Sequence, residues 1–305
     1  RSLSEFGVGS SVLREIKRDP LAAELVIFLY FATHNTRFLN PEPPDYLFRA
    51  SRQLMECMVP TEEIATMKSE KELIDALGQD CFGLLQWILL SNRAQIMTIP
   101  DQQKILNRTK TNMDQFYLYM STPEKENEFQ KLKKKHGSIL AWHGSAMDRW
   151  YPILRQGLKN MSGTVDMRCG DAFGPGIYLG AEAGVSTCYS EELFLNVHWS
   201  KRFTGTYPVA LCEVAKVRQL TYFDNFYTLQ NDDAISVRAL LMVPLNTNTE
   251  FDTKNWIRPS VMNDPYDEPA VPRITQGMMN RNKETRKEKR LARKAKSNAA
   301  VTTNS

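Results

Sequence analysis

The sequence lacks the features that mark membrane and secreted proteins. Its longest apolar run, residues 21–32, is interrupted by Glu24 and is too short to cross a bilayer. No secretory signal is recognisable at the start of the sequence. We therefore expect a protein without a membrane span.

Cysteine is also scarce, and its spacing is uninformative. The five cysteines show no paired spacing, which argues against a disulfide framework or a zinc site. We expect a reducing compartment, hence a nuclear or cytoplasmic location, and no bound metal. The five are Cys57, Cys81, Cys169, Cys188 and Cys212.

Excess positive charge is confined to one segment near the end of the sequence. Residues 281–296 hold nine Lys or Arg against two Glu, a net charge of +7, whereas the whole chain carries +4. The net charge of the remaining residues is therefore −3. This charge does not favour binding of the rest of the chain to nucleic acid. The basic segment is a nuclear-localisation signal, a weak non-specific nucleic-acid contact, or a solvated disordered end, and the sequence leaves these three open.

The first third of the sequence predicts helices. Asp19 before Pro20 is a typical N-cap for a helix that extends to about residue 33. Ser69 and Glu72 form the pattern of a capping box, and Gly78 should end that helix. We expect Asp80 to cap the next helix, residues 81–90, whose apolar composition leaves little polar face, so it should be buried.

A polar corner follows a short apolar run in the middle of the chain. Residues 138–142 predict a buried strand that ends at His143-Gly144-Ser145. Ser145 with Asp148 resembles a capping box, which would place the corner just before a helix. Such a corner often binds a polar ligand, so these residues, Ser145 included, are candidate ligand contacts; a core histidine beside a turn glycine is the open alternative.

A second cluster suggests what that ligand could be. Gly174 and Gly176 permit a tight turn before the strand-like residues 177–179. Tyr178 and Tyr189 could place two aromatic faces around one flat ring, and Ser186 could hydrogen-bond a polar substituent on it. A flat ring carrying a carboxamide fits this arrangement.

Together these residues carry a family resemblance. The pattern runs His143-Gly144-Ser145, then Gly174-x-Gly176-Ile177-Tyr178-Leu179, and then Ser186 and Tyr189. It resembles the catalytic domain of the poly(ADP-ribose) polymerase (PARP) type of ADP-ribosyltransferase. That family has a split, mostly antiparallel β fold that binds NAD+ without a Rossmann motif, and no G-x-G-x-x-G follows a strand in this sequence.

The resemblance implies a role for each residue. His143 would hold the adenine-side ribose of NAD+, and Gly144 would pair its backbone with the nicotinamide carboxamide. Tyr178 and Tyr189 would stack on the nicotinamide, and Ser186 would bond its carboxamide. NAD+ would thus be a co-substrate. Cleavage of the nicotinamide–ribose bond through an oxocarbenium-like state would rest mainly on positioning.

The sequence departs from the family at a third catalytic position. Polymer-forming members carry a Glu on a late strand, but this sequence has no Glu from residue 215 to residue 249. The equivalent position is Phe226, or Tyr227 if the register is shifted by one. A phenyl ring accepts neither a hydrogen bond nor a proton. The candidate catalytic set is therefore His143, Tyr178 and Phe226, which implies transfer of a single ADP-ribose to a protein acceptor.

Two other functions stay open at this point. One is a catalytically inactive module that binds NAD+ or ADP-ribose, and the other is a tethering protein that acts through its basic tail. Residues 85–93 also resemble the helical segment of a mono-ADP-ribosylating PARP subgroup that includes fungal fusions to a ubiquitin-conjugating domain. Whether these helices restrain access of NAD+ is a hypothesis.

Secondary structure is also predicted on either side of the His-Gly-Ser and Gly-x-Gly motifs. Residues 116–120 are expected to form the first strand of the catalytic fold, followed by a charged helix at 122–136 whose lysines favour a solvated face over a contact with NAD+ or nucleic acid. Glu213 lies in a predicted strand, residues 207–214, where structural pairing is favoured over catalysis.

These observations predict an α+β protein in three parts. Residues 1–110 would be a helical domain, with a regulatory role left open. Residues 111–258 would be a PARP-like catalytic domain with a split antiparallel β fold. Residues 259–305 would be a linker and a disordered basic tail.

Overall fold

The described part of the chain consists of helices and one eight-stranded sheet whose neighbouring strands are all antiparallel. The computed structural model describes residues 11–34, 36–39, 42–92, 94–105, 113–119, 123–164, 174–190 and 199–245. The predicted α+β class is confirmed. The basic tail expected at residues 259–305 lies outside the described residues.

Helices open the described part of the chain, and strands interspersed with a few more helices follow them. The helices are α1 (Val12–Arg18), α2 (Pro20–Thr33), α3 (Asp45–Phe48), α4 (Ser51–Cys57), α5 (Thr61–Thr66), α6 (Glu70–Leu77), α7 (Gln79–Leu90), α8 (Pro123–His136), α9 (Trp150–Gln156) and α10 (Ala183–Thr187), with short 3-10 turns η2 (Asp101–Gln103), η3 (Met147–Arg149) and η4 (Asp232–Ala234). The strands are β1 (Gln95–Thr98), β2 (Asp114–Tyr119), β3 (Ser138–Gly144), β4 (Ile177–Gly180), β5 (Thr206–Ala215), β6 (Leu220–Phe223), β7 (Phe226–Leu229) and β8 (Ile235–Pro244).

The first helices begin and end largely where their capping residues predict. The Asp19 carboxylate accepts the Ala22 amide at 2.9 Å and Pro20 opens α2, which confirms that N-cap. Ser69 caps α6 by accepting the Glu72 amide, and Gly78 ends that helix. The prediction that Asp80 caps the next helix is wrong. Gly78 is the N-cap of α7, because the helix starts one residue before Asp80.

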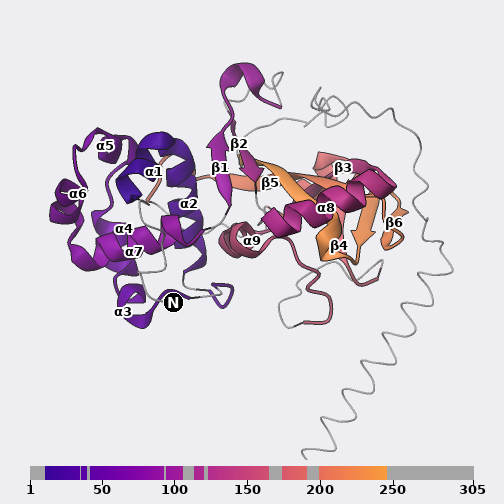
Figure 1. Cartoon of the computed structure of the whole chain (residues 1–305), viewed down its shortest axis with the longest axis horizontal. Helices are drawn as coiled ribbons and strands as arrows, with labels where there is room; N and C mark the ends of the chain where they lie inside the picture. Colours follow the sequence, from indigo (N-terminus) through magenta and orange to yellow (C-terminus); the bar gives the residue numbers. More distant parts are fainter. Residues whose placement is uncertain are drawn as a thin grey trace, which may run out of the picture.

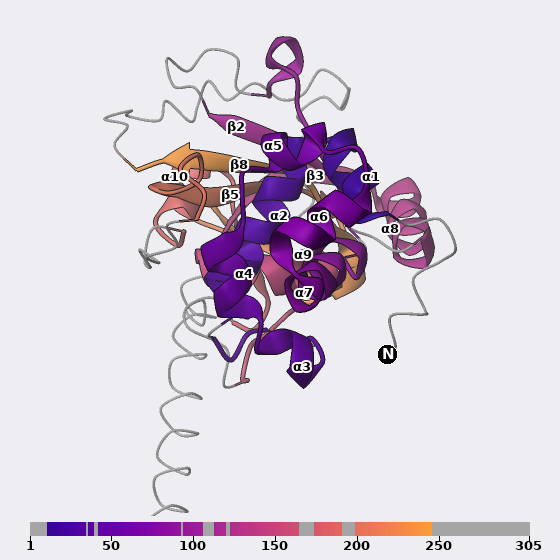
Figure 2. The ribbon, with the colours of Figure 1, turned by 90° about the vertical axis from the view of Figure 1, so that its left-hand side faces the viewer.

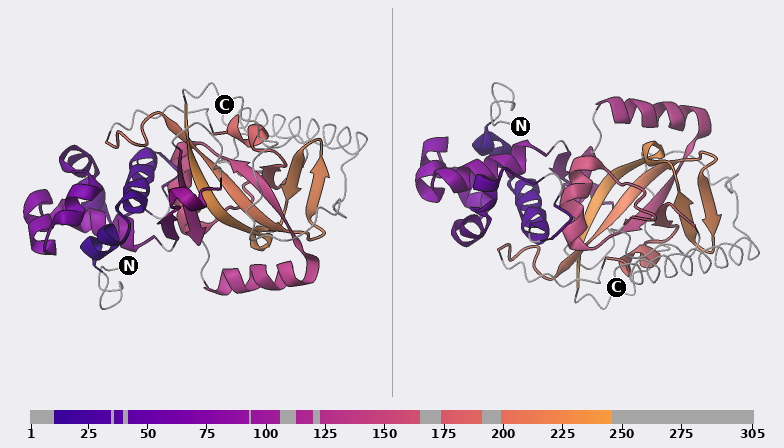
Figure 3. Two further views of the ribbon diagram at one scale, coloured as in Figure 1. Left: turned by 90° about the horizontal axis from the view of Figure 1, so that it is seen from above. Right: turned by 90° about the horizontal axis from the view of Figure 1, so that it is seen from below.

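Helices α1 to α7 gather at one end of the molecule, and the sheet extends away from them (Figure 1). The strand order is β1-β2-β8-β5-β3-β4-β7-β6, so β1 and β2 lie beside the helices and β6 lies at the far edge. The helix α8 covers one face of the sheet and α10 lies on the other side (Figure 3). Strand β1 falls within residues 1–110, the range expected to be helical, and the predicted division into domains stays a prediction.

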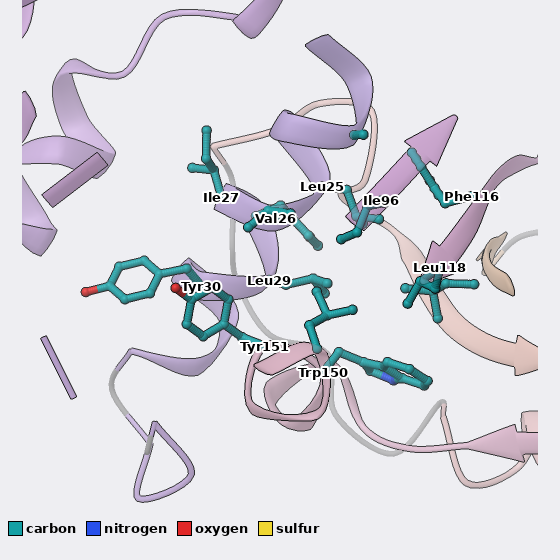
Figure 4. Packing of buried hydrophobic residues seen from close by; sticks show 14 of the residues in the cluster. Leu25, Val26, Ile27, Leu29, Tyr30, Ile96, Phe116, Leu118, Trp150 and Tyr151 are labelled. Carbon is teal, nitrogen blue, oxygen red and sulfur yellow. The ribbon is translucent and has the colours of Figure 1, made fainter. Parts of the chain in front are cut away.

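Helix α2 joins the helices to the sheet in one hydrophobic core. It lies on the side of the N-terminal helices that faces the sheet (Figure 1), near the middle of the helical end in Figure 2, and it contacts β1, η3 and α9. The close view in Figure 4 shows Leu25 near Ile96 of β1, and Tyr30 near Tyr151 of α9, where the two rings meet edge to face at 5.4 Å. Because one buried cluster includes residues of both parts, removing the helices would expose the apolar side of α9 and β1.

The core explains why α2 is apolar on every side. Nearly all of its residues are buried, including the carboxylate of Glu24, which accepts hydrogen bonds from Ser200 at 2.5 Å and from Thr61 at 3.4 Å.

No single helix among the described residues is long and apolar enough to cross a membrane. Helices α6 and α7 are long and apolar enough only when they are taken together, and they bend by 119° where they meet.

Glu213 makes structural ion pairs within the sheet, in agreement with the structural pairing that the sequence favours over catalysis. Its buried carboxylate lies 2.6 Å from the Lys133 ammonium, 3.0 Å from the Arg238 guanidinium and 2.8 Å from the Ser138 hydroxyl. Burial raises the pKa of Glu213, but these three partners outweigh burial and hold the pKa below its usual value. The residue fastens α8 to β3 and β8.

Candidate functional site

A cavity of about 320 Å³ opens where the central strands separate. Strands β3 and β4 pair only at Trp142 and Gly180, so their ends diverge beyond that point. The cavity is lined by the ends of β3 and β4, the first residue of β7, helices α9 and α10, and part of residues 36–39. The structure brings together every site residue that the sequence predicts: His143, Gly144, Ser145, Tyr178, Ser186, Tyr189 and Phe226 all line this cavity.

His143 bridges the gap between the two diverging strands. Its Nδ1 donates to the carbonyl oxygen of Tyr178 at 2.9 Å, and its ring packs edge-on against Trp150 at 6.2 Å between centroids. Burial lowers the pKa of His143, against the opposing effect of that hydrogen bond. The neutral ring therefore keeps its proton on Nδ1 and leaves Nε2 able to accept a hydrogen bond, as from a ribose hydroxyl.

Gly144 provides a place where two segments of backbone meet closely. A Cβ at this position would lie 1.7 Å from the carbonyl oxygen of Ser186, so only glycine fits. The buried Ser186 hydroxyl donates to the carbonyl oxygen of Trp142 at 2.9 Å. Since that donor is used, the lone pairs of Ser186 Oγ can accept from an amide N–H, which suits a carboxamide.

Two tyrosines provide aromatic faces to the cavity. The Tyr178 hydroxyl donates to the carbonyl oxygen of Gly174 at 2.7 Å, which ties the ring to the turn that precedes β4. Tyr189 follows the end of α10 and is 39% exposed. The Tyr178 ring is therefore anchored to that turn, and the Tyr189 ring is partly open to solvent.

Phe226, the predicted third catalytic position, lies in the cavity wall. It opens β7, directly after a two-residue turn, and pairs with Gly180 of β4. The turn residues Asp224 and Asn225 both adopt positive φ, of 43° and 66°, as a tight hairpin requires. The cavity lining among the described residues contains no Asp or Glu at all.

The prediction that Ser145 caps the following helix is wrong. The chain continues into the 3-10 turn η3, whose N-cap is Ala146, and no side chain caps it. The reason is the neighbouring packing: the carbonyl oxygen of Ser145 accepts the Trp150 indole N–H at 3.0 Å, which draws the chain into a tighter turn. Ser145 still lines the cavity.

Among the cavity residues that sequence reasoning missed, three carry charge or an aromatic ring from outside the motifs. They are Arg37 and Phe38, which come from the helical part of the chain, and Arg149 at the end of η3. Arg149 follows the His-Gly-Ser motif closely and could have been noticed as a cation near it. Nothing in the spacing of the other two signals their place, because more than a hundred residues separate them from the motif.

The lysines of α8 are not part of the described cavity lining, and Lys133 contacts a buried carboxylate rather than forming part of a solvated face. Lys131 pairs with Glu128 at 3.1 Å and Lys133 pairs with Glu213, while the described cavity lining includes no residue of α8. No three His, Cys, Asp or Glu side chains gather as a metal site within the described ranges. The expectation of a metal-free reaction stays a prediction.

The fold and the cavity together define a class of protein. The antiparallel strands separate around a histidine, a serine and two tyrosines, the residues on which the resemblance to an ADP-ribosyltransferase catalytic domain depends. Residues 103–250 match the family model described as "Poly(ADP-ribose) polymerase catalytic domain". This part of the chain is similar to the catalytic domain of the PARP family, and PARP enzymes use NAD+ as a substrate.

The names of two proteins similar to this chain are consistent with that family. The two, from Mus musculus and Homo sapiens, are both named "Protein mono-ADP-ribosyltransferase PARP8". Each is 39% identical to this chain over 120 residues, which is 39% of this chain and 14% of the relative. The chain therefore matches only a small part of the length of these relatives.

Proposed function

We propose that this protein transfers a single ADP-ribose unit from NAD+ to a protein acceptor and releases nicotinamide. One observation carries the proposal: His143, Tyr178, Ser186 and Tyr189 line one cavity together with Phe226, the residue that the resemblance puts at the position of the polymer-forming Glu. The names of both relatives describe mono-ADP-ribosyltransferases, which supports the same activity.

Different residues of the cavity would bind the nicotinamide and the ribose of NAD+. The tyrosine rings would hold the nicotinamide, with Ser186 Oγ accepting from its carboxamide N–H. His143 Nε2 would accept from a ribose hydroxyl and fix the orientation of the sugar. The bond between nicotinamide and ribose breaks, its electron pair leaves with the nicotinamide, and an acceptor oxygen or nitrogen forms the new bond and loses its proton to solvent.

The absence of a carboxylate in the described lining also limits the product. A second transfer would need a group that activates a ribose hydroxyl of the first unit, and a phenyl ring cannot do so. Positioning by the tyrosines and His143 would therefore provide most of the rate. A nuclear or cytoplasmic location stays a prediction.

The lack of a carboxylate in the described cavity lining also favours a second function. Without a carboxylate to stabilise the developing cation, the cavity could bind NAD+ or ADP-ribose and catalyse nothing. This binding module would need the same aromatic faces and the same His143. The two functions differ in one measurable product, which is covalently bound ADP-ribose.

Incubation with isotopically labelled NAD+, followed by gel electrophoresis and intact mass of the acceptor proteins, tests the proposal. We expect one added ADP-ribose per site, lost in His143→Ala and in Tyr178→Ala. Tyr46→Ala is the matched control, because Tyr46 is 56% exposed and is absent from the cavity lining. Long ladders would contradict the single-unit product, and NAD+ binding by calorimetry without any label would establish the binding module instead.

A further inference from the structure

The corner that carries His143 is fastened from behind by a residue outside the cavity. Trp150, the first residue of α9, is fully buried and is absent from the described lining. Its indole N–H donates to the carbonyl oxygen of Ser145 at 3.0 Å, and its ring meets the His143 ring edge to face, at 6.2 Å between centroids. One side chain therefore contacts both ends of the His-Gly-Ser motif.

The His143 ring needs this second contact because of its place in the sheet. It lies beyond the point where β3 and β4 pair, and the hydrogen bond from Nδ1 to the carbonyl oxygen of Tyr178 fixes one point of the ring. A single hydrogen bond leaves the ring able to pivot about it, whereas the edge-to-face contact with Trp150 opposes that rotation. Nε2 is therefore kept in one direction, and a fixed acceptor loses little freedom when it binds a ribose hydroxyl.

Helix α2 holds the chain on both sides of the indole. Thr33, its last residue, is fully buried, and its hydroxyl lies 3.0 Å from the carbonyl oxygen of Asp148 and 2.8 Å from a carbonyl oxygen of its own helix. The hydroxyl shares its hydrogen between the two. Asp148 belongs to η3, the turn that leads into Trp150. After Trp150, the Tyr151 ring meets Tyr30 of α2 edge to face at 5.4 Å (Figure 4).

We infer that Trp150 is a positioning residue for the dinucleotide: it holds His143 so that Nε2 meets the adenine-side ribose, and α2 holds Trp150 in place through Thr33. This inference rests on the proposed function for the identity of the ligand. Neither Trp150 nor Thr33 lines the described cavity, so both act on a ligand only through the His-Gly-Ser corner. The helical part of the chain thereby contributes to affinity for the ribose without contacting it.

Binding measurements with parts of the substrate test the inference. Calorimetry on the full chain would compare NAD+, ADP-ribose and benzamide, a flat carboxamide that lacks ribose. Trp150→Phe keeps a buried aromatic ring and removes the indole N–H. We expect it to weaken NAD+ and ADP-ribose about fivefold, because a neutral hydrogen bond contributes roughly that factor. Benzamide affinity should be nearly unchanged, because Gly144 stays paired with Val209 of β5 and the tyrosines are untouched.

Thr33→Val tests the link from α2, and it keeps the inference testable if Trp150→Phe does not fold. Valine has nearly the same shape and lacks the hydroxyl, so η3 loses its hydrogen bond to the helix while the core stays filled. NAD+ and ADP-ribose should weaken and benzamide should not. In the Trp150→Phe background the same change should have a smaller effect, because both residues act through one side chain. Full additivity would overturn the role of Thr33.

Trp199→Phe is the matched control. Trp199 also donates its indole N–H to a backbone carbonyl oxygen, that of Met58 at 3.2 Å, and it does not line the described cavity. Its replacement should lower the melting temperature and leave all three affinities unchanged. Equal weakening of the three ligands in Trp150→Phe would show that the indole only packs. That result, or unchanged affinities in a variant whose fold is verified by circular dichroism, would overturn the inference.

The same design keeps this inference apart from the proposed function, because calorimetry does not depend on transfer. The expected split between ADP-ribose and benzamide, found in a protein that transfers no label, would overturn only the proposed transferase activity. Transfer with a wild-type KM for NAD+ in both Trp150→Phe and Thr33→Val would overturn only the positioning role.

Discussion

His143 Nδ1 and the carbonyl oxygen of Tyr178 are joined by a hydrogen bond of 2.9 Å across the gap between β3 and β4. This bond fixes both the tautomer and the orientation of the ring at the point where the strands part. It also links the two motifs of the sequence directly, since one supplies the donor and the other the acceptor. The site is thus organised before a ligand arrives.

The first prediction concerns the acceptor atom on that ring. His143→Ala removes Nε2 and leaves the Tyr178 carbonyl oxygen without its donor, so NAD+ affinity should fall by about 1–3 kcal/mol. Benzamide affinity should change less, because the nicotinamide end depends on the tyrosines and Ser186. Calorimetry with both ligands measures this, and a larger loss for benzamide than for NAD+ would contradict the ribose role.

The second prediction concerns the close approach at Gly144. In Gly144→Ala the new methyl group would meet the Ser186 carbonyl oxygen at 1.7 Å, so α10 must move away from β3. We expect a lower melting temperature and loss of benzamide binding. Thermal denaturation and calorimetry test this. A matched change is Gly163→Ala, which has open space around it and tests only the cost of a positive φ.

The third prediction restores the missing carboxylate. Phe226→Glu should place an acceptor at the cavity wall and raise the rate at which nicotinamide is released from NAD+, while Phe226→Gln, of similar size and uncharged, should not. Nicotinamide release is measured by chromatography. An equal rate in both variants, with folding verified by circular dichroism, would show that Phe226 lies away from the reacting bond.

The fourth prediction concerns the buried carboxylate of Glu24. Burial raises its pKa above the ordinary 4.5, against the lowering effect of the bond from Ser200. The folded state therefore binds a proton that the unfolded state releases, so this contribution to stability is complete below about pH 4.5 and is lost as pH rises through the folded pKa. Urea denaturation across this range should show wild type losing stability relative to Glu24→Gln as pH rises. A constant difference between the two would contradict it.

The fifth prediction tests the shared core. Leu25 of α2 is fully buried, and Leu25→Ala should lower the free energy of unfolding by about 2–5 kcal/mol. Because the helices and the sheet share one core, far-UV circular dichroism and tryptophan fluorescence should report a single coincident transition. Two separate transitions would show that the helical part folds alone, and deletion of residues 1–100 would then become the direct test of whether it restrains access of NAD+.

Local patterns accounted for much of the fold. Capping at Asp19 and Ser69, the helix stop at Gly78, and the strands around residues 116 and 140 depend on neighbours within a few positions, so the sequence alone indicates them. The failures have non-local causes. Trp150 binds the Ser145 carbonyl oxygen and so prevents the expected cap, and β1 becomes a strand by pairing with β2 rather than by its own pattern.

The sequence by itself determined the chemistry of the site: a histidine, a glycine, a serine and two tyrosines at fixed spacing, and a phenylalanine where a carboxylate was expected. Only the tertiary structure decided how these groups meet. The separation of β3 from β4 creates the cavity, and the packing of α2 against η3 and α9 brings Arg37 and Phe38 to its edge. Contacts between residues more than a hundred positions apart arise from burial of a common core, which leaves no signal in local spacing.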